Sequence, residues 1–322
     1  MPTPHDDARH ASALDDLAWT ELDLPAGPLQ SRLPLRWTDI GSGDGPKVTV
    51  TCGIHGDEGP WSALAVRRAL TRTRHALRGT VRMVLAANPT AVEADARTSP
   101  LDHLDLNRTF PGSADGSHTE RLAAALSGLV DGSDVLIDLH GGGSWCVNSF
   151  VFRFPGSETL ADAVGAPFVV DMPIRQGNLA GHVSAAGTRI VAIEMGGRSV
   201  DEMLWVDRLA RGVERVLIES GVVDGDSLDD APPAPERSVR ASDLSVVRPD
   251  RGGVLVPTVR QDAIGTVVPA GTTLGVVHDL HTMEPIEELV APHERTALLL
   301  IRPHVAVLEG GAMTYVVGRA EE

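Results

Sequence analysis

Two histidines and one glutamate stand in the sequence where a hydrolytic metal site needs its ligands. His55 and Glu58 are three positions apart and come soon after the apolar run at residues 48–51. His140 follows a second apolar run, residues 135–137. Zinc bound by two imidazoles and one carboxylate keeps a fourth position for water, as catalytic sites do and structural sites do not. These residue types predict a metal-dependent hydrolase in which His55, Glu58 and His140 bind one Zn²⁺ ion.

Hydrolysis also needs a group that moves protons. Glu194 ends the apolar run at residues 190–193, and a charge at the end of a buried strand is costly without a catalytic role or a partner. We therefore expect Glu194 to be the general base that takes a proton from water and passes it to the leaving nitrogen. Asp138 lies two residues before His140 and points to the same side of the strand. It is expected to hold the second nitrogen of that imidazole.

Residues 91–116 are polar and have no sustained period, so they are predicted to form a long loop of the kind that often carries function. Within this loop, Asn107 and Arg108 suit a substrate carboxylate, because a guanidinium binds one through two parallel hydrogen bonds and the amide adds a donor. Arg97 is expected to polarise the scissile carbonyl and stabilise its oxyanion.

The elements that must position these residues alternate between strands and helices. Such alternation is typical of an α/β fold, with a mainly parallel or mixed central sheet flanked by helices. Ligand sites in such sheets lie at the carboxyl ends of the strands, which is where the two histidine motifs fall. The expected strands are residues 48–52, 81–87, 135–139, 150–154 and 189–193, and the expected helices are residues 60–72, 120–130 and 201–219.

The pattern changes after residue 224. Residues 224–237 are acidic and rich in proline, which predicts a linker. Residues 239–317 contain short runs rich in valine and glycine, which predict a small β-barrel or sandwich. The sequence therefore predicts a catalytic domain at residues 1–230 and an all-β domain at residues 231–322.

Composition excludes several classes of function. The net charge of −16 argues against binding to nucleic acid or to an anionic membrane surface. Lys47 is the only lysine, so no mechanism can use a second one. The two cysteines, Cys52 and Cys146, are expected to be reduced packing residues. Residues 1–16 have no apolar signal core, and no run reaches membrane length, so we expect a soluble cytoplasmic protein.

Four ordered motifs contain most of the candidate site residues. They are G-x-H-G-D-E at Gly53 to Glu58, D-L-N-R-x-F-P-G at Asp105 to Gly112, D-L-H-G at Asp138 to Gly141 and I-E-x-G at Ile193 to Gly196. Taken together, they resemble the succinylglutamate desuccinylase/aspartoacylase family, within the metallocarboxypeptidase clan. The likeness spans roughly residues 45–320, and the segment Arg97-Thr98-Ser99-Pro100 is similar to the branch that contains N-acetyl-diaminobutyrate deacetylase.

This resemblance implies a carboxypeptidase-like fold and a zinc-dependent amidohydrolase that removes an acyl group from the nitrogen of an amino acid. It carries His55, Glu58 and His140 over as ligands, Glu194 as base, and Asn107 with Arg108 as the carboxylate clamp. Arg175 and Arg189 are the candidates for an arginine that binds a second substrate carboxylate.

The expected partner is a small N-acyl amino acid, with no nucleic acid or membrane, and a homodimer is one possible assembly. Two alternatives remain open. One is a metallocarboxypeptidase that acts on short peptides, and the other is a non-catalytic metal-dependent binding protein.

Overall fold

The computed structural model describes residues 14, 17–24, 33–41, 43–198 and 201–322. Its largest feature is a mixed twelve-stranded sheet with the strand order β1-β2-β4-β3-β5-β8-β6-β7-β9-β16-β14-β11. The strands of its first part are β1 (Thr20–Leu22), β2 (Leu35–Gly41), β3 (Lys47–Cys52), β4 (Thr80–Val84), β5 (Val135–His140), β6 (Val147–Arg153), β7 (Phe168–Asp171) and β8 (Arg189–Gly196).

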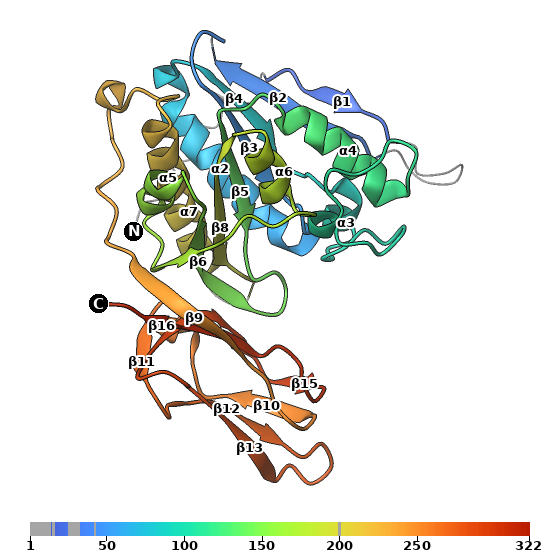
Figure 1. Ribbon diagram of the computed structural model, residues 1–322, viewed down its shortest axis with the longest axis vertical. Coiled ribbons are helices and arrows are strands. Elements are labelled where there is room, and N and C mark those ends of the chain that lie inside the picture. The colour runs from blue at the N-terminus through green and yellow to red at the C-terminus, as the bar shows by residue number, and fades with distance from the viewer. Residues whose placement is uncertain (1–13, 15–16, 25–32, 42, 199–200) are drawn as a thin grey trace.

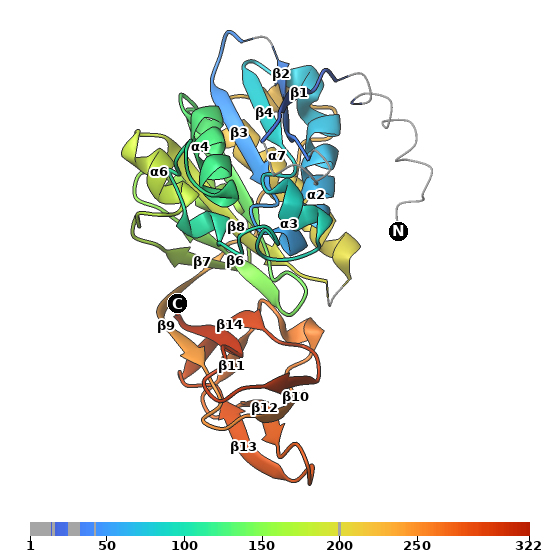
Figure 2. The same ribbon diagram turned by 90° about the vertical axis from the view of Figure 1, so that its right-hand side faces the viewer.

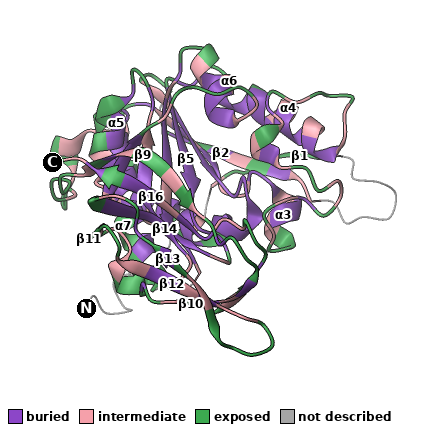
Figure 3. Cartoon of the chain, turned by 60° about the horizontal axis from the view of Figure 1, so that its bottom comes forward, coloured by how far each residue is buried: buried purple, intermediate pink, exposed green. Residues whose placement is uncertain are grey.

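Four neighbouring strands, β4, β3, β5 and β8, are parallel and form the centre of this sheet. Every residue of β5 is buried, as Figure 3 shows, which explains why its sequence is a nearly continuous apolar run. Because the strands are parallel, their carboxyl ends meet at one edge of the sheet. Both histidine motifs therefore reach the same edge, as the sequence predicts.

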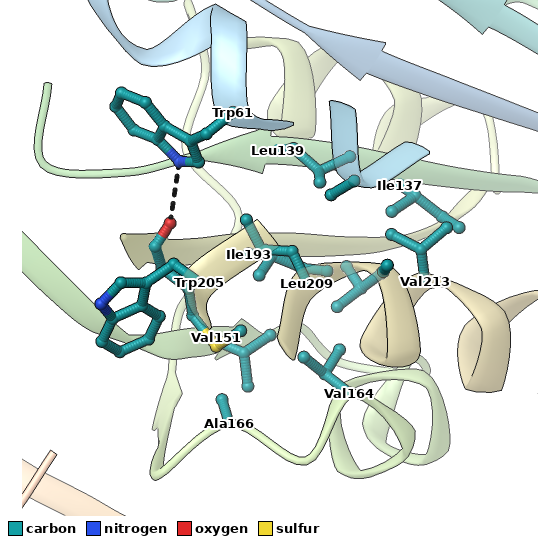
Figure 4. Close-up of a cluster of buried hydrophobic side chains, with 14 of the residues drawn as sticks. Trp61, Ile137, Leu139, Val151, Val164, Ala166, Ile193, Trp205, Leu209 and Val213 are labelled. Atoms are coloured by element: carbon teal, nitrogen blue, oxygen red, sulfur yellow. Dashed lines mark hydrogen bonds between the residues drawn. The ribbon is translucent and has the colours of Figure 1, made fainter. Parts of the chain in front are cut away.

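Helices cover both faces of the sheet (Figures 1 and 2). One face carries α2 (Gly59–Thr73), α5 (Glu158–Val164) and α7 (Glu202–Glu219), and the other carries α4 (His118–Val130) and α6 (Leu179–Ala185). Successive side chains of β5 point to opposite faces of the sheet. Ile137 packs on the side of α2 and α7, and Leu136 packs on the side of α4 and α6. Figure 4 shows the first of these layers, where the indole of Trp61 donates a hydrogen bond to the carbonyl of Met195.

The helix ends follow from local sequence. Pro60 lies in the first turn of α2, where the missing N–H costs nothing. Ser117 and Glu120 form a reciprocal capping box at the start of α4, and the side chain of Asp201 caps α7. All three predicted helices are present, and each end lies within two residues of the expected one.

The sequence does not predict three short elements between residues 158 and 185. They are α5, β7 and α6, of four to seven residues each. The predicted long loop at residues 91–116 is mostly irregular, but it includes the end of α3 (Pro89–Glu93) and a 3₁₀ turn at Leu106–Arg108. Elements this short carry too few residues to show a period in sequence.

The strands after the linker form two groups, and the first of these joins the sheet described above. β9 (Val239–Val247) pairs with β7, and β14 (Arg295–Ile301) pairs with β6, so these strands continue the catalytic sheet together with β16 (Tyr315–Ala320) and β11 (Val267–Pro269). A separate four-stranded sheet has the order β13-β12-β10-β15. Its strands are β10 (Gly253–Pro257), β12 (Thr273–His278), β13 (Pro285–Val290) and β15 (Ala306–Leu308).

Both groups of strands lie below the carboxyl-end edge of the central sheet in Figure 1. Leu300 of β14 and Val316 of β16 line the same cavity as the predicted metal ligands. Residues 295–320 therefore contribute to the site as well as to the sheet. Among the described residues, no helix is both long enough and apolar enough to cross a bilayer.

Candidate active site

The three predicted metal ligands come together at the carboxyl ends of β3 and β5. His55 follows β3, Glu58 ends the 3₁₀ turn Gly56–Glu58, and His140 is the last residue of β5. One potential ligand atom from each lies within 4.8 Å of the others, and all three residues are at most 5% exposed. Glu58 and His140, which are 82 positions apart in the sequence, thus lie in one buried cluster with His55.

The donor atoms converge on a single carboxylate. Nδ1 of His55 lies 3.0 Å from one oxygen of Glu58, and Nδ1 of His140 lies 3.1 Å from the other. Two imidazole nitrogens and a carboxylate are the donor set of catalytic zinc sites. A divalent cation among these atoms would also compensate the buried negative charge of Glu58. The residues present therefore fit Zn²⁺ as the group that the sequence predicts.

The Nε2 atom of each imidazole contacts an aspartate. Asp138 lies 2.9 Å from Nε2 of His140, which is the predicted contact, and its other oxygen accepts a hydrogen bond from Thr51. Asp105 lies 3.1 Å from Nε2 of His55. When each Nε2–H donates to its aspartate, the lone pair of Nδ1 points to the centre, so these aspartates fix the tautomer that binds metal.

Asp105 belongs to the candidate site but is not predicted from the sequence. Its only distinction there is that it begins the D-L-N-R motif. Its contact with His55 joins residues 50 positions apart, one of them in an irregular loop. The available signal was the motif itself, in which an acidic residue stands directly before the predicted carboxylate clamp.

Close backbone approach explains the glycines around the first motif. Gly53 has a φ of +70°, a conformation that residues with a Cβ rarely adopt. A Cβ on Gly56 would lie 2.0 Å from the backbone of Ala91. Both positions let the chain turn sharply between β3 and α2 and bring His55 and Glu58 to the same point.

Electrostatics within the cluster are dominated by burial and by the paired charges. Burial lowers the pKa of His55, but the carboxylates of Glu58 and Asp105 outweigh this effect and raise it overall. Burial alone would raise the pKa of Glu58, yet the two histidines hold it well below its usual range. Glu58 is therefore ionised and ready to act as a ligand.

Glu194 lies directly beside His140, since the two residues are paired in the β5–β8 register. Asn148 of β6 donates a hydrogen bond of 2.8 Å to one of its carboxylate oxygens. Burial raises the pKa of Glu194 to about 7, against the opposing attraction of His140. No arginine or lysine of the described residues forms an ion pair with it. These surroundings suit a proton carrier near neutral pH better than a structural charge.

A cavity of about 430 Å³ contains the predicted metal ligands and Glu194 in its wall. Three residues of the long loop also line it, namely Arg97, Asn107 and Arg108. Arg97 lies 3.4 Å from Glu58 and 3.0 Å from Asp105. The side-chain oxygen of Asn107 accepts a hydrogen bond from the backbone of Leu179, which leaves its NH₂ group as a donor. Arg108 donates to the backbone carbonyl of Asn107.

The two candidates for a second substrate arginine differ in position. Arg175 lines this cavity and is exposed. Arg189 begins β8, at the opposite end of the strand from Glu194, and lines a separate hollow with Asp134 and Gly187. Arg189 therefore does not line the cavity, because the length of β8 separates it from Glu194.

Replacing Asp138 with asparagine is expected to weaken metal binding by about 10- to 100-fold, because the amide supports the basicity of His140 less than a carboxylate does. Competition with a chelator of known affinity measures the change. Asp171→Asn is the matched control, since Asp171 pairs only with Arg153 and Arg240 at the surface. Equal metal affinity in the Asp138 variant and this control would contradict the assigned role.

The chain is similar to known proteins of one family. Residues 44–220 match the model of the succinylglutamate desuccinylase/aspartoacylase catalytic domain. N-alpha-acetyl-L-2,4-diaminobutyric acid deacetylase from Halomonas elongata is 30% identical, with 96% of this chain and 89% of that protein covered.

Solved structures share the whole fold. A succinylglutamate desuccinylase/aspartoacylase from Rhodobacter sphaeroides superposes with a TM-score of 0.79 at 25% identity and covers 95% of each chain. The product-bound ectoine utilization protein EutE (DoeB) from Ruegeria pomeroyi also gives 0.79, at 24% identity, over 95% of this chain and 96% of that one. Fold, family model and relative agree, and the chain belongs to the succinylglutamate desuccinylase/aspartoacylase family.

Proposed function

We propose that this chain is a zinc-dependent amidohydrolase that removes an acyl group, acetyl or succinyl, from the nitrogen of a small amino acid. Membership of a family of N-acyl amino acid deacylases supports the reaction class. The single observation that carries the proposal is the position of Glu194, next to His140 in register and open to the same cavity as the metal ligands.

His55, Glu58 and His140 hold the metal in this proposal. When bound, Zn²⁺ supplies a Lewis acid that makes water more acidic and polarises the scissile carbonyl. Glu194 accepts a proton from the attacking water and delivers it to the amide nitrogen as the bond breaks. Arg97 donates hydrogen bonds to the carbonyl oxygen as negative charge develops there.

The substrate carboxylate lies between the free NH₂ group of Asn107 and the guanidinium of Arg108. Both are fixed by the backbone contacts described above, so the donors are oriented before substrate arrives. This orientation limits the freedom lost on binding. Cys146 also lines the cavity, but burial raises the pKa of its thiol well above the usual value, which suits packing rather than nucleophilic attack.

Residues 231–322 are proposed to act as a β domain that limits the size of the substrate. Leu300, Met313 and Val316 form part of the cavity wall, so this segment closes one side of the site. A closed side favours a small acyl amino acid over a peptide, whose chain must continue beyond the scissile bond.

A deacylation screen tests the proposal. Protein reconstituted with Zn²⁺ is assayed on N-acetyl, N-succinyl and N-formyl amino acids, with short peptides as a parallel set. We expect hydrolysis within the acylated set and little or none of the peptides. Faster cleavage of peptides would support the carboxypeptidase alternative, and metal binding without any turnover would support a non-catalytic binder.

Replacing Arg108 with lysine is expected to raise KM about 10- to 100-fold with a smaller effect on kcat. Lysine keeps the charge but cannot form two parallel hydrogen bonds to a carboxylate. Steady-state kinetics on the best substrate of the screen measures this change. Arg153→Lys, at a surface ion pair with Asp171, is the control. A fall in kcat at unchanged KM would place Arg108 elsewhere in the reaction.

The base assignment also predicts a pH dependence. Glu194 works only when it is ionised, so kcat/KM should fall as the pH falls through its pKa. That pKa is raised to about 7 by burial, and the nearby charge of a bound divalent cation lowers it. The acidic limb of the profile is therefore expected below about pH 7. Activity that increases on acidification through this range would contradict the assignment.

A further inference from the structure

A row of three phenylalanines forms one wall of the active-site cavity. Phe150, Phe152 and Phe154 line it, and because they alternate along and just beyond β6 they face the same side of the sheet. The rings of Phe150 and Phe152 meet edge to face with centroids 5.0 Å apart. Phe152 is half-buried, whereas its two neighbours are buried. We call these three residues the phenylalanine row.

The phenylalanine row lies beside the group that handles the leaving amine. Phe150 pairs with Glu194 in the antiparallel register of β6 and β8, and Phe152 pairs with Ala192. Ala180 of α6 and Ala192 also line the cavity, and both have short apolar side chains. Since Glu194 protonates the departing nitrogen, the amino acid part of the substrate lies close to these rings.

The charges of the cavity disfavour a basic substrate side chain. Among the described residues that line it, the only acidic ones are Glu58, Asp138 and Glu194, and all three already have a role in the proposed catalytic centre. Arg108 and Arg175 add positive charge outside that centre. A side-chain ammonium would find no further carboxylate and would lose water, which the weaker attraction of phenylalanine faces does not offset.

We propose that the phenylalanine row binds an uncharged, apolar side chain of the substrate amino acid, with Phe152 as the main specificity-determining residue. This inference rests on the proposed deacylase function. It separates the chain from its relative in Halomonas elongata, whose named substrate carries a side-chain amine. An apolar side chain excludes water from the rings and from the neighbouring proton-transfer path.

The first test compares side chains on the zinc-loaded protein. N-acetyl-L-leucine is expected to give a kcat/KM at least about 10-fold above that of N-acetylglycine, since one well-placed methylene is worth about that much. N-acetyl-L-2,4-diaminobutyrate is expected at or below the glycine compound. N-hexanoylglycine carries the apolar group on the acyl side instead. A gain for this compound alone, or a preference for diaminobutyrate, overturns the proposal.

Variants of Phe152 sharpen the test. Phe152→Ala should lower the leucine-to-glycine ratio of kcat/KM, whereas Phe152→Leu, the matched apolar control, should keep it. Phe152→Glu should reverse the leucine-to-diaminobutyrate ratio, because it supplies the missing carboxylate. Thermal unfolding establishes that each variant is folded. An unchanged ratio in folded Phe152→Glu protein contradicts the proposal.

A binding measurement separates this inference from the reaction itself. Calorimetry on the wild-type protein should give tighter binding of the product L-leucine than of L-2,4-diaminobutyrate. If no acyl amino acid is hydrolysed, the proposed function fails, and the binding preference alone then decides whether the row selects apolar groups. If turnover occurs and the two amino acids bind equally, only the inference on specificity fails.

Discussion

Glu194→Gln should lower kcat by about 10²- to 10⁴-fold while metal content and KM stay close to wild type. Glutamine has nearly the same shape and can still contact Asn148, which now donates to Glu194 at 2.8 Å. It cannot accept a proton from water at neutral pH. The loss therefore falls on the chemical step, and single-turnover kinetics with metal analysis on the same sample measures it.

A second buried glutamate provides the control for this variant. Glu214 of α7 is 1% exposed and pairs with Arg72 and Arg211, away from the cavity. Glu214→Gln should lower the melting temperature, because it weakens a buried ion pair, and leave the kcat of the folded protein unchanged. If Glu194→Gln instead behaved like this control, Glu194 would be a structural residue and the base would have to be sought elsewhere.

His140→Ala should abolish detectable turnover by removing one of the three proposed metal ligands. The loss of metal affinity is expected to exceed the roughly 100-fold that an outer carboxylate contributes. Its partners Glu58 and Asp138 would keep buried charges with one contact fewer, so the metal-free variant should also be less stable. Equilibrium dialysis against Zn²⁺ and thermal unfolding measure the two effects.

The matched control is His182→Ala, because His182 pairs with Asp131 outside the cluster and does not line the cavity. This variant should bind Zn²⁺ as the wild type does. Normal metal content and turnover in folded His140→Ala protein would mean that the ion, if bound, uses other ligands.

The sequence predicts that His140 and Glu194 meet because two physical patterns coincide at them. His140 and Glu194 each end an apolar run, and such runs become buried parallel strands whose carboxyl ends share one edge. Polar residues that stop these runs must meet there. Asp138 follows from the same alternation, since it lies two positions before His140 on the same face.

Asp105 and the phenylalanine row could not be found in this way. Asp105 reaches His55 from an irregular loop, where no periodicity fixes the direction of a side chain. In the sequence, the phenylalanine row looks like ordinary residues of a hydrophobic core. Only the pairing of β6 with β8 places it beside Glu194. The attachment of β14 to β6 joins Ile301 to Val147, a contact whose partners the local sequence does not specify.

The most direct measurement of the central claim is anomalous diffraction at the zinc edge from a crystal of Zn²⁺-loaded protein. We predict one strong peak per chain, about 2.1 Å from Nδ1 of both His55 and His140 and at a similar distance from a Glu58 carboxylate oxygen. The Nε2 atoms should stay on Asp105 and Asp138. No peak at this position, or a peak bound through Nε2, would contradict the account.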